Sequence, residues 1–201
     1  MKTKTIQSLI MSIQLCFVLI LFTSACAQNN NSSTAKKTLK QVQSDNSSQN
    51  DIKEDIHMAI ISGNKDVVEQ LIKAGTDLNQ REQMNGSTPL MTAITFNKPE
   101  ITQMLINAKP DLTIKNNDGS TALHNASFFC RIDMVKMLLD AGADKTLKNN
   151  YGMTSREIVM GDFKDIKPIY EMLILQLKPM GFQLDLKEVE KARPVVAMML
   201  E

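Results

Sequence analysis

Three glycines, Gly86, Gly119 and Gly152, lie 33 positions apart, and each opens a similar run of residues. The first is followed by Ser-Thr-Pro-Leu-Met-Thr-Ala, the second by Ser-Thr-Ala-Leu-His-Asn-Ala, and the third by a weaker copy, Met-Thr-Ser. A fixed period of this length is typical of a stacked array, in which each unit is too small to bury its own apolar side chains. Such arrays usually present a surface to a partner, so the spacing favours a binding protein.

The first 26 residues have the layout of a secretory signal peptide. Lys2 and Lys4 precede an unbroken apolar stretch over 15–22, and small residues follow at 23–27. Thr-Ser-Ala-Cys at 23–26 resembles a bacterial lipobox, which predicts lipidation of Cys26 as the new N-terminus. Ala27 after that cysteine resembles signals for the outer membrane. Two alternatives are cleavage after Ala27, which leaves a soluble periplasmic protein, and an uncleaved anchor.

Residues 27–50 hold almost no apolar side chains, so we expect a disordered polar linker between the export signal and the folded part. The chain has three cysteines. Removal of the signal peptide discards Cys16, and lipidation would block Cys26, which leaves Cys130. An intramolecular disulfide framework is therefore not expected, and the fold must be stabilised by packing.

The repeated segments resemble the ankyrin repeat. Thr-Pro-Leu at 88–90 and Thr-Ala-Leu-His at 121–124 match the first half of that motif, and residues 68–77 and 135–144 match the second half. The resemblance covers about residues 52–177. It implies an all-α repeat solenoid of helix–turn–helix units joined by hairpin loops, with about four units and modified terminal caps. We therefore expect an ankyrin repeat domain over 51–177 and a C-terminal helical cap over 178–201.

Local residue choices agree with helical units. Thr88 and Thr121 are suited to cap the first helices, and Pro89 suits a first helical turn. Gly75 and Gly142 are placed to end the second helices. In the fourth unit we expect a second helix around 169–173. A last short helix should open at Asp-x-x-Glu over 185–188, and Pro194 should interrupt or end it.

Residue types that could support catalysis have structural explanations. His57 and His124 occupy the same repeat position, where the family's histidine holds the hairpin against the helix. Cys130 lies at the turn between two helices with no base beside it, which predicts a passive packed thiol. Gly-rich phosphate loops, nucleophile motifs and metal-ligand clusters are absent from the sequence. We expect no enzyme, cofactor or metal, and the net charge of +1 does not favour nucleic acid.

Aromatic residues gather where ankyrin arrays contact partners, on the hairpin tips and the last turn of each first helix. The predicted partner-binding residues are Met84, Ser87, Thr95, Phe96, Phe128, Phe129, Tyr151 and Met153. Aromatic side chains on a rigid surface are typical binding anchors. Alternatively, the rings pack on each other or on the next unit. Arg81, Lys115 and Lys148 recur beside them as a thin basic stripe.

The sequence thus predicts a monomeric, non-enzymatic protein–protein interaction module of a Gram-negative cell envelope, facing the periplasm. Alternatives are an immunity or inhibitor protein against a toxin or enzyme, a protective factor for a periplasmic enzyme, and an envelope scaffold. The identity of the partner does not follow from the residues.

Overall fold

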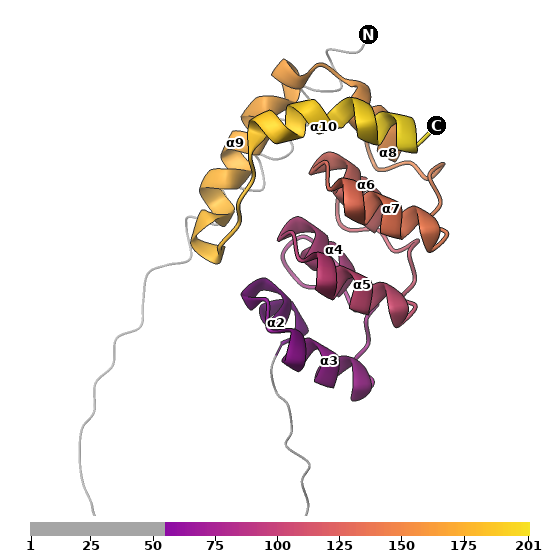
Figure 1. Ribbon diagram of the computed structural model, residues 1–201, viewed down its shortest axis with the longest axis vertical. Helices are drawn as coiled ribbons and strands as arrows, with labels where there is room; N and C mark the ends of the chain where they lie inside the picture. Colours follow the sequence, from indigo (N-terminus) through magenta and orange to yellow (C-terminus); the bar gives the residue numbers. More distant parts are fainter. Residues whose placement is uncertain (1–54) are drawn as a thin grey trace, which may run out of the picture. The chain divides into compact units, whose positions relative to one another are not determined.

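The computed structural model describes residues 55–201, and this part of the chain is helical (Figure 1). Because the predicted signal peptide, Cys26 and the polar linker over 27–50 precede it, they lie outside the described residues. The helices are α2 (Ile56–Ser62), α3 (Lys65–Lys73), α4 (Pro89–Thr95), α5 (Pro99–Asn107), α6 (Ala122–Phe128), α7 (Ile132–Asp140), α8 (Ser155–Met160), α9 (Phe163–Leu177), the 3-10 turn η2 (Lys178–Met180) and α10 (Leu186–Met199).

The helices form two stacked columns. The inner helices α2, α4, α6 and α8 each pack on the next, and the outer helices α3, α5 and α7 do the same. Within each of the first three units, the inner helix also packs on its outer partner, α2 on α3, α4 on α5 and α6 on α7. Figure 1 shows these pairs stacked one above another. The predicted all-α repeat solenoid is confirmed.

The core lies between successive units, and the repeat period determines which side chains enter it. Ala59, Ala93 and Ala126 occupy one recurring position of the inner helices, and each is fully buried. A small side chain there allows neighbouring helices to approach closely. In the outer helices Leu105 and Leu138 recur at one position and are fully buried as well. Each unit thus completes the core of its neighbour.

The inner helices begin where the sequence predicts. The Thr88 hydroxyl accepts a hydrogen bond from the Met91 N–H at 3.4 Å, and Pro89 is the first helical residue. Thr121 precedes α6, and its N–H donates to Nδ1 of His124 at 3.2 Å. With Nδ1 accepting, Nε2 of His124 donates to the Met153 carbonyl at 3.1 Å. His124 therefore ties one inner helix to the following hairpin loop.

The fourth unit departs from the expected arrangement. The helix expected near 169–173 belongs to α9, which spans 163–177, whereas α10 packs on α8 and α7 as the outer helix of this unit. Residues 161–185, comprising α9, η2 and the extended return segment 181–185, are therefore an insertion between an inner helix and its outer partner. The boundary predicted after residue 177 falls inside this insertion.

Two features of α10 correct and extend the prediction. Asp185 opens the helix as expected, because its carboxylate accepts hydrogen bonds from the N–H groups of Lys187 and Glu188. Pro194 does not end it, since α10 continues to Met199 with the proline side exposed. Arg193, only 5% exposed, donates to the carbonyl oxygens of Gly161 at 2.8 Å and Ile158 at 3.4 Å. These bonds fasten α10 to the end of α8.

Within residues 55–201, none of the helices combines the length and the apolar character that crossing a bilayer requires.

The neutral form of His124 should make the fold sensitive to mild acid. Burial lowers the pKa of this imidazole below its ordinary value of about 6.5. The unfolded chain then binds more protons than the folded one below that value, so the free energy of unfolding falls as the pH falls. The slope reaches at most about 1.4 kcal/mol per pH unit for one histidine.

Urea unfolding of wild type and His124→Gln at pH 7.5 and 5.5 would measure this effect. Glutamine at this position retains the capping geometry without a titrating group. We expect the stability difference between the two pH values to shrink in His124→Gln, and also in His57→Gln, because burial lowers the pKa of that imidazole as well. An unchanged difference in His124→Gln would contradict the assignment.

Replacing Arg193 should loosen the last unit. Arg193→Met leaves the Ile158 and Gly161 carbonyls without their charged donor, and we expect a loss of about 1–3 kcal/mol in urea unfolding. Lys191→Met, on the exposed side of the same helix, should change stability by about 0.5 kcal/mol or less. Equal losses in both variants would show that Arg193 has no special role.

Candidate functional site

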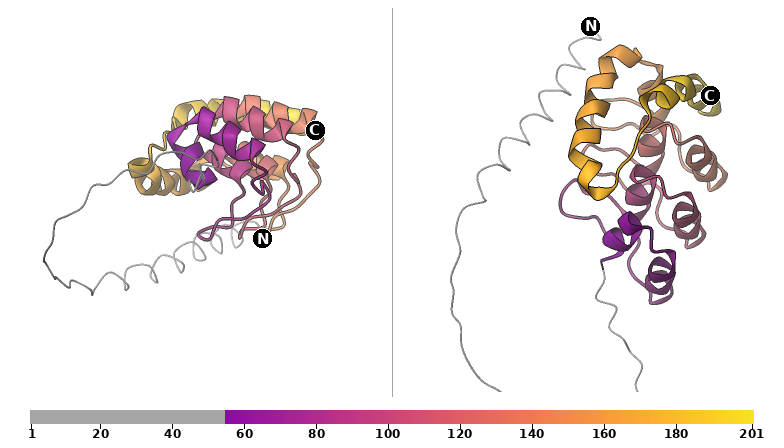
Figure 2. Two further views of the ribbon diagram at one scale, coloured as in Figure 1. Left: turned by 90° about the horizontal axis from the view of Figure 1, so that it is seen from below. Right: turned by 60° about the vertical axis from the view of Figure 1, so that its left-hand side comes forward.

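The solenoid presents two different surfaces at the two ends of its inner helices. The hairpin face consists of the loop tips over 79–88, 112–121 and 145–154. The turn face consists of the short turns over 96–98 and 129–131, which join inner to outer helices. Figure 2, in its left panel, shows the loops gathered on one side of the stack and α9 lying toward the other.

The hairpin face is a continuous hydrogen-bonded ladder. The Asn117 N–H donates to the Asn85 carbonyl at 2.9 Å, and the Asn150 N–H donates to the Asp118 carbonyl at 3.0 Å. The side-chain amide of Asn150 also donates to the Asn117 carbonyl at 3.0 Å. Gly119 has a φ of +72°, and a Cβ there would overlap the Asn150 side chain. The loops therefore hold one another in a fixed register.

Each loop is braced from inside by one polar side chain. Asn116 Oδ1 accepts from the N–H groups of Asp118 and Ser120, and Asn149 has the same role in the next loop. In the first loop Glu82 takes this position and accepts from Met84, Asn85 and Ser87. Partial burial raises the pKa of Glu82, but the hydrogen bonds from these N–H groups together lower it by more. The pKa of Glu82 therefore lies below its usual value. Sequence reasoning missed this brace.

The predicted contact residues of the hairpin face differ in accessibility. Met84 is 84% exposed at the tip of the first loop, so it is free to contact a partner. Tyr151 is half-buried, and its hydroxyl donates to Asp118 Oδ1 at 3.3 Å. Met153 is half-buried, and its carbonyl accepts from His124. Ser87 is buried and braced by Glu82, so it is framework.

Two members of the basic stripe hold neighbouring loops together. Arg81 Nη2 donates to Asn117 Oδ1 at 2.6 Å, and its Nε donates to the Gly86 carbonyl at 3.1 Å. Lys115 Nζ donates to the Lys148 carbonyl at 2.8 Å. These contacts join each loop to the next one. They explain why a basic residue recurs at this position, and no binding partner is needed for that explanation.

The turn face corrects the expectation of exposed aromatic anchors. Phe129 is only 6% exposed, and Phe96 and Phe128 are half-buried. The insertion covers them: Phe182 contacts Phe96 at 6.1 Å and Phe129 at 5.6 Å between ring centroids, both edge-on. Sequence reasoning allowed that these rings pack internally, but it did not identify Phe182 as the covering residue.

A second aromatic residue of the insertion completes this packing. The Tyr170 ring lies 4.7 Å from the Phe128 ring, and its hydroxyl donates to the Phe128 carbonyl at 2.5 Å. Burial raises the pKa of this phenol, so it remains a donor at physiological pH. Thr95, the remaining predicted contact residue, is half-buried in the last turn of α4.

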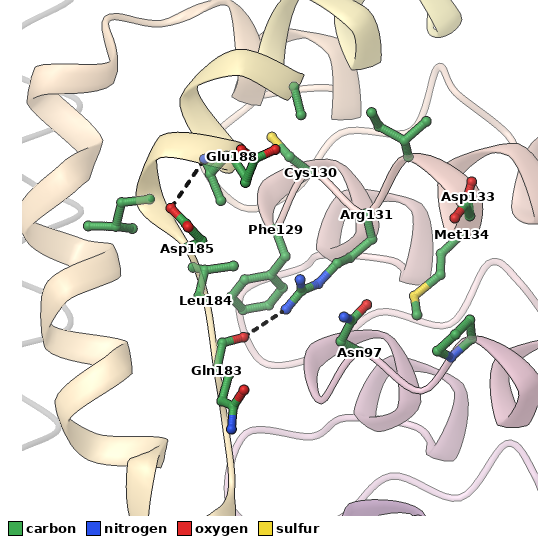
Figure 3. Close-up of a pocket in the computed structure, with 15 residues that line it drawn as sticks. Asn97, Phe129, Cys130, Arg131, Asp133, Met134, Gln183, Leu184, Asp185 and Glu188 are labelled. Carbon is green, nitrogen blue, oxygen red and sulfur yellow. Dashed lines mark hydrogen bonds between the residues drawn. The ribbon is translucent and has the colours of Figure 1, made fainter.

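An open groove of about 920 Å³ lies between the turns and the return segment (Figure 3). Arg131 crosses it and donates from Nη2 to the Gln183 carbonyl at 3.3 Å. Cys130, in the left-handed conformation at φ +51°, lines the same groove. Burial raises the pKa of its thiol to about 11, so the thiolate is scarce near neutral pH. This arrangement is suited to packing and not to nucleophilic chemistry.

The two histidines lie apart and bind structural partners. His57 Nδ1 is 2.8 Å from the Thr92 hydroxyl, whereas His124 contacts Thr121 and Met153. Burial lowers the pKa of both imidazoles. Across residues 55–201, histidine, cysteine, aspartate and glutamate do not gather in any group of three that could hold a metal ion.

Comparisons with known proteins agree with this architecture. A family model described as ankyrin repeats (3 copies) matches residues 56–149. Protein phosphatase 1 regulatory subunit 27 from Mus musculus is 39% identical over 63 residues, which are 31% of this chain and 40% of that protein. An ankyrin repeat-containing protein of Schizosaccharomyces pombe is 42% identical over 64 residues, 31% of this chain and 29% of that protein. The chain thus spans less than half the length of these curated relatives.

A solved structure shares the fold. The ankyrin repeat domain of Bcl-3, described as a unique member of the IkappaB protein family, matches with a TM-score of 0.50 and 26% identity. The match covers 58% of this chain and 50% of that one. The matched region of the family model coincides with the three regular helix pairs, α2 to α7. Residues 56–149 therefore match the ankyrin repeat model and share the ankyrin repeat fold, and a modified fourth unit follows them.

Proposed function

We propose that this protein is a non-enzymatic binding protein of the bacterial cell envelope, which recognises a protein partner through its hairpin face. The observation that carries the proposal is the hydrogen-bonded ladder of the loops, which holds Met84 and its neighbours in a fixed arrangement. A preordered surface loses little conformational entropy on binding, so its contacts contribute more fully to affinity.

The two faces differ in accessibility, and this difference supports the hairpin face as the binding surface. The turn face is covered by the insertion, whereas the hairpin face carries Met84, which is 84% exposed, and the half-buried Tyr151 and Met153. A flexible methionine adapts to an apolar pocket, and Tyr151 adds a ring with a polar tip. We therefore place the partner's apolar contact between the first and third loops, with the amides of Asn85 and Asn117 at its edge.

The relatives support a regulatory or adaptor role. The mouse relative is named a regulatory subunit of protein phosphatase 1. Ankyrin repeats are typically non-catalytic, and the geometry of the histidines and Cys130 offers no competing chemistry. Our proposal for this chain is the binding role itself, with a partner in the envelope.

Affinity capture with and without the hairpin contacts tests the proposed surface. Tagged wild type, Met84→Ser plus Tyr151→Ala, and the control Leu175→Ser would be crosslinked in the native envelope and the captured proteins identified. Leu175 is 76% exposed on α9, which lies on the side of the stack opposite the hairpin loops (Figure 2). We expect the double variant to capture at least tenfold less of the partner than wild type, and the control to capture as much as wild type. Equal recovery by all three, at equal stability in urea, would refute the hairpin face as the site.

Lipid anchoring is tested separately by labelling cells with radioactive palmitate. We expect the wild type and Cys130→Ser to incorporate the label and Cys26→Ser to lose it, because Cys26 is the proposed acceptor. A processed but unlabelled wild type would instead indicate a soluble periplasmic protein. Neither result tests the proposed binding surface.

A further inference from the structure

The insertion 161–185 is attached to a solenoid that is already complete without it. The outer helix α10 packs directly on α8 and α7, so the fourth unit has both of its helices in place. Arg193 holds α10 to the carbonyls of Ile158 and Gly161, at the root of the insertion. Arg193 also lies 5.9 Å from the centre of the Phe163 ring of α9, but the packing of α10 on α8 and α7 does not run through α9.

Three side chains of the insertion are buried, and three more are partly buried against the core. Among residues 161–185 only Ile169, Tyr170 and Phe182 are buried, whereas Leu175 is 76% exposed and Met180 is 39% exposed. Segments with few buried apolar contacts open locally at a lower free energy than the whole domain. We therefore expect the insertion to open locally before the helix pairs of the stack.

Beneath the insertion lies a slot with the features of a peptide-binding site. Its walls are the rings of Phe96 and Phe129, and Phe182 fills it with only 2% of its own surface exposed. The guanidinium of Arg131 donates to the main-chain carbonyl of the next residue, Gln183. Leu184 then lines the groove beside Phe129, as Figure 3 shows. The recognised unit is an extended Phe-x-Leu segment.

The groove adjoins the slot at Phe129, which lines both of them. It runs along the return segment on the side of Asn97, Pro99 and Arg131, and it is open to solvent (Figure 3). An incoming extended chain can therefore contact Arg131 before Phe182 has left. We infer the chemistry of the partner segment from residues 182–184, which fill the slot in this structure.

We propose that the slot between Phe96 and Phe129 is a second protein-recognition site, which takes an extended segment with phenylalanine two residues before leucine. Residues 182–184 of the same chain occupy it when a partner segment is absent. This site is distinct from the hairpin face, because it lies at the other end of the inner helices α4 and α6.

Hydrogen exchange of the full mature chain tests whether the insertion opens by itself. We expect the amides of α9 to exchange at least 100-fold faster than those of α6, α7 and α10, under conditions where the fold is stable. This comparison requires no variant, so it does not depend on whether a substitution folds. Exchange of α9 only together with α6 would overturn the proposal.

Binding in trans tests the slot itself. The probe is a labelled peptide of residues 179–187, Pro-Met-Gly-Phe-Gln-Leu-Asp-Leu-Lys, followed by fluorescence anisotropy. We expect it to bind full-length Phe182→Ala, whose slot is vacated, at least tenfold more tightly than wild type. The same peptide with alanine for phenylalanine should not bind. Equal affinity of the probe for Phe182→Ala and wild type would overturn the proposal.

Two further variants make the result specific. Phe182→Ala combined with Phe129→Ala removes one wall of the slot and should lose the peptide, whereas Phe182→Ala combined with Leu175→Ala changes an exposed side chain and should retain it. If Phe182→Ala fails to fold by circular dichroism, Tyr170→Phe replaces it. That variant keeps the ring but removes the hydrogen bond to Phe128, so it should bind the probe more tightly than wild type.

Discussion

Within residues 55–201, a single pair of short helices is too small to bury its own apolar side chains, and the rest of the structure depends on that constraint. Each unit buries one side against the unit before it and the other against the unit after it. The positions shared by Ala59, Ala93 and Ala126 are fully buried only because a neighbouring inner helix lies against them. The two ends of the stack therefore need special elements, and the last unit is where this chain departs most from its own period.

The modified fourth unit separates two tasks that a regular unit would combine. Its outer helix α10 closes the stack, and the Arg193 guanidinium satisfies carbonyls at the end of α8, where a positive charge is favourable. The insertion is then free to cover the turn face with Phe182 and Tyr170. One repeat thus provides both the cap of the solenoid and a cover for three aromatic residues of the earlier units.

The 33-residue period predicts the local structure within a unit, but it does not predict contacts between segments that are distant in the sequence. Thr88 and Pro89 start α4 as expected, and His124 has the structural role that its repeat position indicates. Each of these features depends on neighbours a few residues away or on the same position of the next unit. The position shared by Asn97 and Cys130 also repeats, and both residues adopt the left-handed turn.

The partners of the aromatic cluster could not be predicted in this way. Phe182 contacts Phe96 across 86 positions, and the insertion that brings it there has no period, so its register follows only from packing. Likewise, a proline such as Pro194 signals the end of a helix locally, but buried side chains on both sides, Val189 and Val196, keep α10 in place. The partner-binding role of the predicted residues stays a prediction, and their accessibility depends on residues outside the repeats.

The short inner helices also determine how the two faces can influence each other. Helices α4 and α6 contain seven residues each, so the faces are separated by only about 10 Å of helix. Every side chain of α4 from Pro89 to Ile94 is buried, which makes this helix a stiff connection with no room to rotate. The ladder of the hairpin loops depends on Asn117 and Asn150, whose hydrogen bonds join neighbouring loops. On the proposed mechanism, opening of the slot leaves these bonds intact, and we expect the domain to bind two protein segments at the same time.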